Sequence, residues 1–298
     1  MTIRPRRSIL YMPGSNARAI AKARTLPADA VILDLEDSVA PDAKETARSQ
    51  VVDAVRAGGF GAREVFVRVN GLDTPWCVDD LGAVCAAAPD AILLPKIAKA
   101  AQLEQIGKRL LDTQTDHRTR VWAMLETPFA VLNVREIAAA ALDSETRFTG
   151  FVLGTNDLAK DTSARIVPGR TPMLAWLSLA VAAARAYGLF VIDGVYNVLG
   201  DADGFARECA QARDLGFDGK TLIHPNQIDV CNTAFSPGAD EVAQARRIIA
   251  AFDLPENKDR GVVALDGRMV ERLHAETARR TVAIAEAIAE RANQSTSV

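Results

Sequence analysis

Two acidic residues follow apolar runs at points where a buried strand would end. Glu126 comes directly after "VWAML" (121–125), and Asp157 follows "FTGFVLGTN" (148–156). Carboxylates gathered at one edge of a sheet repel each other unless a cation lies between them. Because oxygen ligands suit Mg²⁺ and also Mn²⁺, this pair predicts a metal site. In the alternative, Asp157 caps the helix that follows it, and Glu126 pairs with Lys96 or Arg68.

Arg68 supplies a second chemical group, a guanidinium flanked by apolar residues in "VRVN" (67–70). Its planar fork of donors suits a carboxylate or an enolate oxygen. In the alternative, Arg68 forms a structural salt bridge with the acids of "DLED" (34–37). Lys44 and Arg48 are one helical turn apart, and we expect both to pair with those same acids.

The stretch "MPGSNARAIAK" (12–22) has the pattern of a strand that turns into a helix. Backbone N–H groups at a helix start bind phosphate readily, and Arg18 and Lys22 would share one face of the helix. The stretch therefore predicts a phosphate-binding site. In the alternative, Ser15 or Asn16 is only the helix cap.

The elements that must position these residues form a regular alternation of apolar runs and Ala-rich helical runs. The apolar runs are continuous, which is typical of parallel strands covered on both faces. Eight such strands are expected, at residues 8–13, 30–37, 64–71, 91–96, 121–127, 148–155, 188–196 and 216–224. This count predicts a (β/α)8 TIM barrel. A doubly wound sheet is the main rival, but no GxGxxG follows the first run.

In such a barrel the active site lies at the carboxyl ends of the strands. The residues that the runs deliver to this rim are Asp34, Glu36, Asp37, Arg68, Asn70, Lys96, Glu126, Asp157, Asp193 and His224. His224 is assigned to the structure of the rim or to a substrate contact. Residues 1–235 are predicted to form the catalytic barrel, and residues 236–298 a C-terminal helical extension that acts as a lid or contacts a neighbouring subunit.

The composition is ordinary for a soluble protein. The chain has 298 residues, 49% of them hydrophobic, and a formal net charge of −3. This balance gives no basic surface for nucleic acid, and no apolar run approaches the roughly 18 residues of a membrane helix. The four cysteines have neither metal-ligand spacing nor a CxxC pair. Reduced thiols in a cytoplasmic protein are therefore expected.

Several of these stretches together resemble the citrate lyase β-subunit-like (CitE-like) proteins of the HpcH/HpaI aldolase superfamily. The resemblance extends over about residues 6–230 and is carried by "RRSILYMPGSNARAIAKA", "AVILDLEDSVAPDAKETAR", "VFVRVNG", "LLPKI", "LETPFAVLN", "VLGTNDLAKD", "IDGVY" and "GFDGKTLIHPNQI", in that order. "ALDGRMVERL" (264–273) is similar to the lid segment of the family.

The resemblance implies a (β/α)8 barrel that assembles as a homotrimer or homohexamer and binds Mg²⁺. Glu126 and Asp157 match the metal ligands, and Glu126 also faces the substrate. Arg68 matches the arginine that binds the substrate and takes part in catalysis, and Asp37 is assigned to the same catalytic group.

The resemblance also implies contacts with coenzyme A and a lid acid. Tyr11, Arg18 and Lys22 fall where members that use coenzyme A contact this cofactor. The family's lid has Met-Ile-Asp, whereas this chain has Met269-Val270-Glu271. Glu271, or Asp266 five residues earlier, is therefore predicted to be the general acid/base.

The function predicted from the resemblance is Mg²⁺-dependent C–C bond cleavage or formation. The substrate would be a malyl-, citramalyl- or citryl-coenzyme A thioester, and the products acetyl-coenzyme A, or a related acyl thioester, and a 2-oxo acid. One alternative is hydrolysis of a malyl-coenzyme A thioester. Another is the β subunit of a citrate lyase, which acts on a thioester of an acyl carrier protein. The last is a non-catalytic barrel that only binds an acyl thioester or a partner protein.

Overall fold

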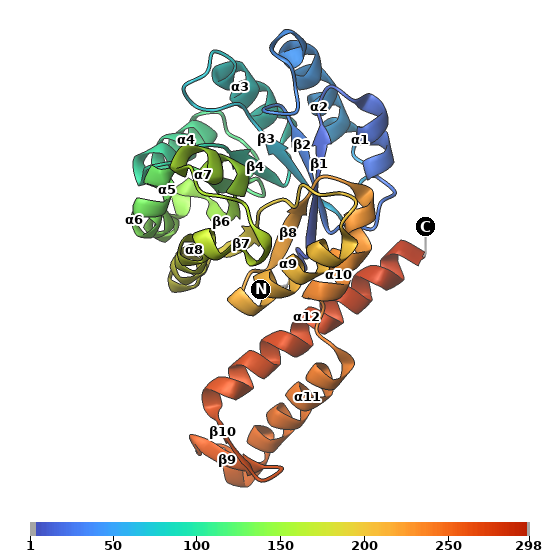
Figure 1. Ribbon diagram of the computed structural model, residues 1–298, viewed down its shortest axis with the longest axis vertical. Coiled ribbons are helices and arrows are strands. Elements are labelled where there is room, and N and C mark those ends of the chain that lie inside the picture. The colour runs from blue at the N-terminus through green and yellow to red at the C-terminus, as the bar shows by residue number, and fades with distance from the viewer. Residues whose placement is uncertain (1–3, 297–298) are drawn as a thin grey trace. The chain divides into compact units, whose positions relative to one another are not determined.

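The structure is a computed structural model that describes residues 4–296. Eight parallel strands close into a barrel in sequence order, with β1 pairing with both β2 and β8, and helices surround the strands (Figure 1). The predicted (β/α)8 barrel with C-terminal helices is confirmed. The strands are β1 (Ser8–Pro13), β2 (Ala30–Asp34), β3 (Glu64–Arg68), β4 (Ala91–Leu94), β5 (Arg120–Leu125), β6 (Phe148–Leu153), β7 (Phe190–Asp193) and β8 (Gly219–Leu222).

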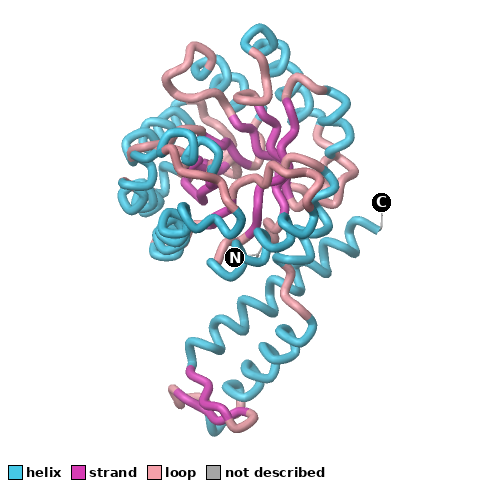
Figure 2. The backbone as a smooth tube through the Cα atoms, in the orientation of Figure 1, coloured by secondary structure: helices cyan, strands magenta, loops and turns pink. Residues whose placement is uncertain are grey.

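The helices follow the strands and are joined to them by loops of different lengths (Figure 2). Gly58 and Gly216, at the ends of α2 and α9, have φ angles of 64° and 97°, which glycine adopts without a steric cost. The helices are α1 (Ala17–Ala23), α2 (Lys44–Ala57), α3 (Cys77–Ala87), α4 (Ala100–Asp112), α5 (Pro128–Leu132), α6 (Val134–Ala139), α7 (Thr155–Thr162), α8 (Leu174–Ala186), α9 (Ala202–Leu215) and α10 (Ile228–Phe235).

The strands bury both faces, as their continuous apolar runs predict. Alternate residues point into the barrel, where Phe66, Trp122 and Ile192 belong to one apolar cluster. The other residues of each strand face the helices and form a larger cluster. This alternation decides which side chains at the strand ends can reach the central site.

Several predicted strands extend beyond the observed ones at the carboxyl end. The run 30–37 ends as a strand at Asp34, because the Asp34 carboxylate accepts hydrogen bonds from the backbone N–H groups of Glu36 and Ser38 at 2.9 and 3.1 Å. A side chain that bonds to its own following backbone in this way forms a turn. The polar ends of the runs are therefore loops over the barrel.

The chain divides into two compact units, residues 6–235 and a second unit that holds residues 236–296 with Arg4 and Pro5. The second unit pairs α11 (Ala239–Asp253) with α12 (Arg272–Thr296), and the antiparallel strands β9 (Val262–Leu265) and β10 (Arg268–Glu271) lie between them in the chain. It has its own small core, formed by Phe252, Val263, Val270 and Ala275. Residues 1–3 and 297–298 of the predicted domains lie outside the described residues.

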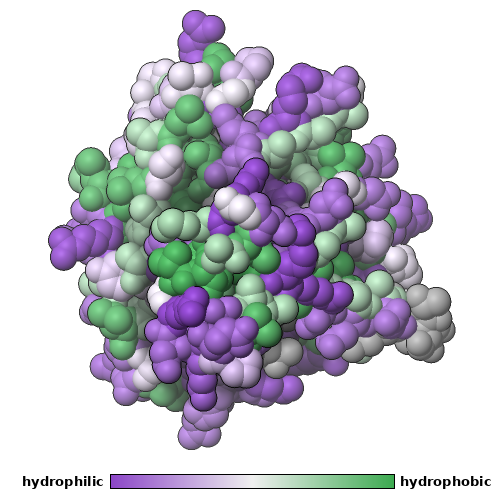
Figure 3. Space-filling view, turned by 90° about the horizontal axis from the view of Figure 1, so that it is seen from below, coloured by the Kyte–Doolittle hydropathy of each residue, from purple (hydrophilic) through white to green (hydrophobic). Residues whose placement is uncertain are grey.

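Hydrophilic residues dominate the face seen in Figure 3, with smaller hydrophobic patches among them. Within residues 4–296, every helix is too short or too polar to cross a lipid bilayer.

Candidate active site

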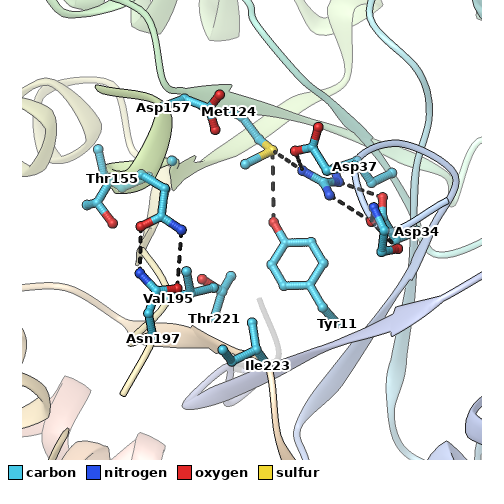
Figure 4. Close-up of a pocket in the computed structure, with 15 residues that line it drawn as sticks. Tyr11, Asp34, Asp37, Met124, Thr155, Asp157, Val195, Asn197, Thr221 and Ile223 are labelled. Carbon is cyan, nitrogen blue, oxygen red and sulfur yellow. Dashed lines mark hydrogen bonds and ion pairs between the residues drawn. The ribbon is translucent and has the colours of Figure 1, made fainter. Parts of the chain in front are cut away.

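A cavity of about 300 Å³ opens at the carboxyl ends of the barrel strands. Its walls combine charged groups, which come mainly from the β2 and β3 ends, with apolar and amide side chains from the β6, β7 and β8 ends (Figure 4). The lining residues are Tyr11, Asp34, Asp37, Ser38, Arg68, Met124, Leu153, Gly154, Thr155, Asn156, Asp157, Val195, Asn197, Thr221 and Ile223.

Glu126 lies just outside the end of β5 and is 1% exposed. Its Oε1 accepts a hydrogen bond of 2.6 Å from the backbone N–H of Lys96. Burial, followed by the nearby Glu36 carboxylate, raises the pKa of Glu126 to about 8. Thr127 caps α5 and Pro128 is its first residue, so the chain turns away immediately after delivering this carboxylate.

Asp157 is the third residue of α7, and its half-buried side chain lines the cavity. Gly154 lies between the two acids. A Cβ atom at Gly154 would lie 2.6 Å from Glu126 Oε2, so only glycine permits this close approach of the turn to the Glu126 carboxylate. The Asp157 carboxylate contributes to the raised pKa of Glu126, so the two acids lie close enough to interact.

The two acids fit a magnesium ion that keeps several other ligands. Nowhere in residues 4–296 are three His, Cys, Asp or Glu side chains grouped so as to hold a metal ion. Mg²⁺ is commonly bound by one or two carboxylates together with waters and substrate oxygens. A buried carboxyl with a raised pKa also gains from a bound cation. The expected pairing of Glu126 with Lys96 is present only through the Lys96 backbone N–H.

Arg68 forms the salt bridges that the sequence offered as an alternative, and it also lines the cavity. Its Nε and Nη2 donate to the two oxygens of Asp34 at 2.6 and 2.7 Å. Nη1 lies 2.8 Å from Glu36 and 3.2 Å from the more exposed Asp37. The guanidinium is thus fixed on one edge by Asp34, and its remaining nitrogen faces weaker partners and the cavity.

Lys44 and Arg48 were expected to pair with the acids of residues 34–37, and this prediction is wrong for their carboxylates. The Lys44 ammonium donates to the backbone carbonyls of Leu35 and Glu36 and to Asn70 Oδ1, at 2.8, 2.8 and 2.7 Å. Arg48, one turn further along α2, binds Asp80 of α3 at 2.7 Å. Lys44 is the first residue of α2, and it stabilises the turn after β2 by donating to the carbonyl groups of that turn.

Asp193 was expected at the catalytic rim, but the structure places it elsewhere. Ile192 points into the barrel, so the next residue of β7 points outward. Its carboxylate is fully buried and binds Arg170 Nη1 and Lys220 Nζ, each at 2.7 Å. Asp193 therefore stabilises the outer side of the barrel.

His224 was expected to support the rim or to contact substrate, and its position favours support. Its Nδ1 accepts a hydrogen bond of 3.2 Å from the backbone N–H of Asn226, which caps the short helix Pro225–Gln227. The neighbouring Ile223 lines the cavity, and His224 is not among the described residues that line it.

The three residues assigned to coenzyme A lie in two different settings. Tyr11 lines the cavity, and its hydroxyl faces Met124 Sδ at 3.9 Å (Figure 4). Arg18 and Lys22 are exposed on α1, outside the cavity wall. Asn16 accepts a hydrogen bond from the backbone N–H of Ala19, so the helix cap that the sequence offered as an alternative is present.

Comparison with known proteins identifies the family. The sequence model described as HpcH/HpaI aldolase/citrate lyase matches residues 7–225. This chain belongs to the HpcH/HpaI aldolase/citrate lyase family. The resemblance that the motifs predicted is therefore confirmed, and the family identifies the protein as an enzyme related to lyases.

Relatives and solved structures cover nearly the whole chain. A protein from Cereibacter sphaeroides named (3S)-malyl-CoA thioesterase is 50% identical over 96% of both chains. The citrate lyase subunit beta of Escherichia coli is 37% identical over 90% of this chain and 89% of its own. A crystal structure of CitE from Mycobacterium tuberculosis, in complex with magnesium, acetoacetate and coenzyme A, is 32% identical. It matches 93% of this chain and 97% of its own with a TM-score of 0.73.

The segment that resembles the lid of the family, residues 264–273, includes the turn and the second strand of the β9–β10 hairpin in the second unit. Asp266 and Gly267 have φ angles of 52° and 74° in the turn between β9 and β10, and Asp266 pairs with Arg247 at 2.9 Å. Glu271 is the last residue of β10 and is exposed. Its backbone N–H donates to His274 Nδ1 at 2.9 Å, and no ion pair of the described residues involves its carboxylate.

The sequence reasoning missed most of the uncharged cavity wall, including Met124, Thr155, Val195, Asn197 and Thr221. Two-residue periodicity could have found some of these positions. Met124 and Glu126 lie on the same side of β5, as Thr221 and Ile223 do at β8. Asn197 lies in a loop, where no periodicity applies.

Proposed function

We propose that this protein is a Mg²⁺-dependent hydrolase of a coenzyme A thioester whose acyl group carries a hydroxyl and a second carboxylate. Malyl-coenzyme A is the first candidate. The observation that carries the proposal is that Arg68, Asp37 and Asp157 line one cavity, with Glu126 buried beside its Gly154 wall. Relatives named (3S)-malyl-CoA thioesterase, at 47–50% identity, favour this thioester, and favour hydrolysis over the C–C cleavage predicted from the sequence.

Glu126 and Asp157 are the proposed metal ligands. When bound, Mg²⁺ would supply a positive charge for the hydroxyl and carboxylate oxygens of the acyl group. The Lys96 N–H holds Glu126 in place from one side, and Gly154 leaves room on the other side. This support matters because ligand geometry depends on the groups behind the ligands.

Arg68 and Asp37 are proposed to act at the thioester. The Nη1 edge of Arg68, which faces Glu36, Asp37 and the cavity, stabilises the negative charge that develops on the carbonyl oxygen. Asp37, whose side chain is 60% exposed and only 3.2 Å from Arg68, accepts a proton from the attacking water. The water oxygen then bonds to the carbonyl carbon, the C–S bond breaks, and the thiolate takes a proton.

Glu271 is the better candidate for the acid that supplies this proton. Asp266 is already paired with Arg247, whereas Glu271 ends a strand with its carboxylate exposed. In line with the family resemblance, we propose a homotrimer or homohexamer in which the lid of one copy serves the barrel of another. Arg18 and Lys22 would bind coenzyme A phosphates, and Tyr11, inside the cavity, would lie nearer the acyl end.

C–C cleavage is the second candidate. Relatives named citrate lyase subunit beta are 33–37% identical, and the Nη1 edge of Arg68 would equally stabilise an enolate oxygen. In that reaction Glu271 would protonate the enolate carbon. The exposed Arg18 and Lys22 would also suit an acidic acyl carrier protein in place of coenzyme A.

One assay separates these reactions. Purified protein is incubated with Mg²⁺ and with malyl-, methylmalyl-, citramalyl- and citryl-coenzyme A, and the products are separated by chromatography. Hydrolysis gives free coenzyme A and the hydroxy acid, whereas cleavage gives an acyl-coenzyme A and a 2-oxo acid. Turnover that is unchanged in chelator, or in Glu126→Gln, would contradict the proposed metal chemistry.

A further inference from the structure

Lys96 lies in the loop between β4 and α4, and none of the roles above uses its side chain. Its φ angle is 54°, a left-handed conformation that glycine adopts easily and lysine adopts at a cost. This conformation directs the backbone N–H to Glu126. Because glycine would serve the backbone better, the presence of a lysine here suggests that its side chain has a use.

The Lys96 ammonium lies at the edge of the acidic cluster. Its Nζ is 3.5 Å from Glu36 Oε1, and its side chain is 48% exposed, so it reaches solvent as well as the cluster. The other Glu36 oxygen is 2.8 Å from Arg68 Nη1. Glu36 is therefore the link between the two cations of the site.

The charges around this link are unequal. Asp34, Glu36, Asp37, Glu126 and Asp157 lie near Arg68 and Lys96. A third cation, the buried Lys44, is bonded to the backbone carbonyls of Leu35 and Glu36. Arg68 is buried and committed to Asp34 by two hydrogen bonds. Lys96 is thus the solvent-exposed cation of the cluster.

We propose that Lys96 is a built-in counter-cation of the free site, which stabilises the clustered carboxylates and opposes the metal ion when it binds. The inference rests on the proposed metal site at Glu126 and Asp157. A fixed positive charge near a divalent ion weakens its binding. Removing the positive charge of Lys96 should therefore strengthen Mg²⁺ binding. This holds even where Mg²⁺ displaces one proton from a carboxyl group, because Mg²⁺ carries twice the charge of a proton.

The test is Mg²⁺ binding to the full-length protein without substrate, measured by isothermal titration calorimetry. Lys96→Met removes the charge and keeps the aliphatic chain, whereas Lys96→Gly removes the side chain, relieves the left-handed backbone and keeps the N–H group. Both variants should bind Mg²⁺ with a Kd about three- to tenfold lower than the unmodified protein, as expected for one nearby charge. Lys99→Met is the matched control: Lys99 is exposed in the same loop and should leave the Kd unchanged.

The outcomes separate the two proposals. If the unmodified protein binds no Mg²⁺, or if Glu126→Gln binds it equally well, the metal site itself is wrong. If the site binds Mg²⁺ but the two Lys96 variants have an unchanged or higher Kd, the counter-cation role is wrong and the metal site stands. A lower Kd in Lys96→Gly alone would come from the relieved backbone and would overturn the role. A lower Kd in Lys96→Met alone would also overturn it, because both variants remove the charge.

Discussion

Glu126, a proposed metal ligand, is a buried acid that is unfavourable for the stability of the free protein. Its carboxyl group is 1% exposed and lies near the Glu36 carboxylate. Burial of a negative charge is unfavourable without a cation, which is why its pKa rises to about 8. Residues held in this way at functional sites commonly lower the stability of the free protein.

The stability of the metal-free protein should therefore depend on pH through Glu126. A carboxyl whose pKa is raised on folding stabilises the fold fully below its unfolded value of 4.5, and this contribution is lost as pH rises through about 8. Glu36, with a pKa raised to about 7 by burial, acts in the same direction. In chelator, the Tm should fall between these pH values.

Glu126→Gln should reduce this pH dependence, since the amide does not ionise and still accepts the Lys96 N–H. Its Tm in chelator at pH 8 should equal or exceed that of the unmodified protein, while turnover falls by about 100-fold or more. Thermal unfolding followed by circular dichroism at pH 5 and pH 8 checks the first part. A large loss of Tm at pH 8 would mean that the carboxylate stabilises the free fold.

Arg68→Lys should reduce turnover although it keeps the positive charge. Lysine cannot bind both oxygens of Asp34 and also present a second nitrogen to the cavity. The loss of one donor to a developing oxyanion costs about 100-fold in kcat, and we expect a loss of that size. Arg48→Lys, which alters a comparable ion pair with Asp80 outside the cavity, is the matched control and should retain near-normal kcat.

At the scale of elements, the β6–α7 turn sets the distance between the two proposed metal ligands. In Gly154→Ala the new Cβ would lie 2.4 Å from Glu126 Cβ and 2.6 Å from its Oε2. The turn must then shift, so Mg²⁺ binding should be lost, with a stability cost of about 1–3 kcal/mol from overpacking. Gly200→Ala is the control because its Cβ would have open space around it. Calorimetric Mg²⁺ titration and thermal unfolding test both variants.

The barrel elements could be predicted from sequence because continuous apolar runs and Ala-rich runs alternate. The ends of these strands could not be predicted from sequence, because turns such as the one at Asp34 depend on which backbone N–H groups a side chain reaches. The same limit explains the site. Arg68 and Glu126 lie at the ends of β3 and β5, and Asp157 lies in the first turn of the helix after β6. Asp193 points outward because of a one-residue difference in phase at β7.

The ion pair of Asp193 and Lys220 leads to a prediction about the stability of the β7–β8 region. Lys220 is fully buried and bonds to both Asp193 and Glu208 at 2.7 Å. Lys220→Met leaves the buried Asp193 and the partly buried Glu208 with one fewer cation and should cost about 3–5 kcal/mol in unfolding free energy. Adding Asp193→Asn should recover part of this loss. Urea unfolding measures both, and equal stability of the single variant and the unmodified protein would contradict it.

The ion pair of Asp193 and Lys220 also makes the stability of the barrel depend on pH at low pH. Burial would raise the pKa of Asp193, but Lys220 and Arg170 outweigh it and lower that pKa. A carboxyl with a lowered pKa stabilises the fold above its unfolded value of 3.8, and the stabilisation is lost as pH falls further. The destabilisation at low pH and the one from Glu126 at high pH therefore occupy separate pH ranges.

At the scale of the whole molecule, the sequence could name the candidate lid acids but could not choose between them. The choice depends on the hairpin, which commits Asp266 to Arg247 and leaves Glu271 exposed. The periodic pattern of apolar residues in a sequence gives no information about such an ion pair. The proposed assembly, in which a lid serves the barrel of another copy, follows from the family resemblance and can be tested with two inactive variants.

Glu126→Gln and Glu271→Gln should each be inactive or nearly so, the first for want of a metal ligand and the second for want of the lid acid. If the active site is shared between copies, a mixed oligomer contains sites with an intact barrel from one variant and an intact lid from the other. In a randomly mixed 1:1 cyclic oligomer, about a quarter of the sites combine both intact parts. Co-expressed and co-purified mixtures should thus regain about a quarter of the normal turnover, and size-exclusion chromatography should show an oligomer. If each lid serves its own barrel, every site in the mixture keeps one defect, and turnover stays at the level of the separate variants.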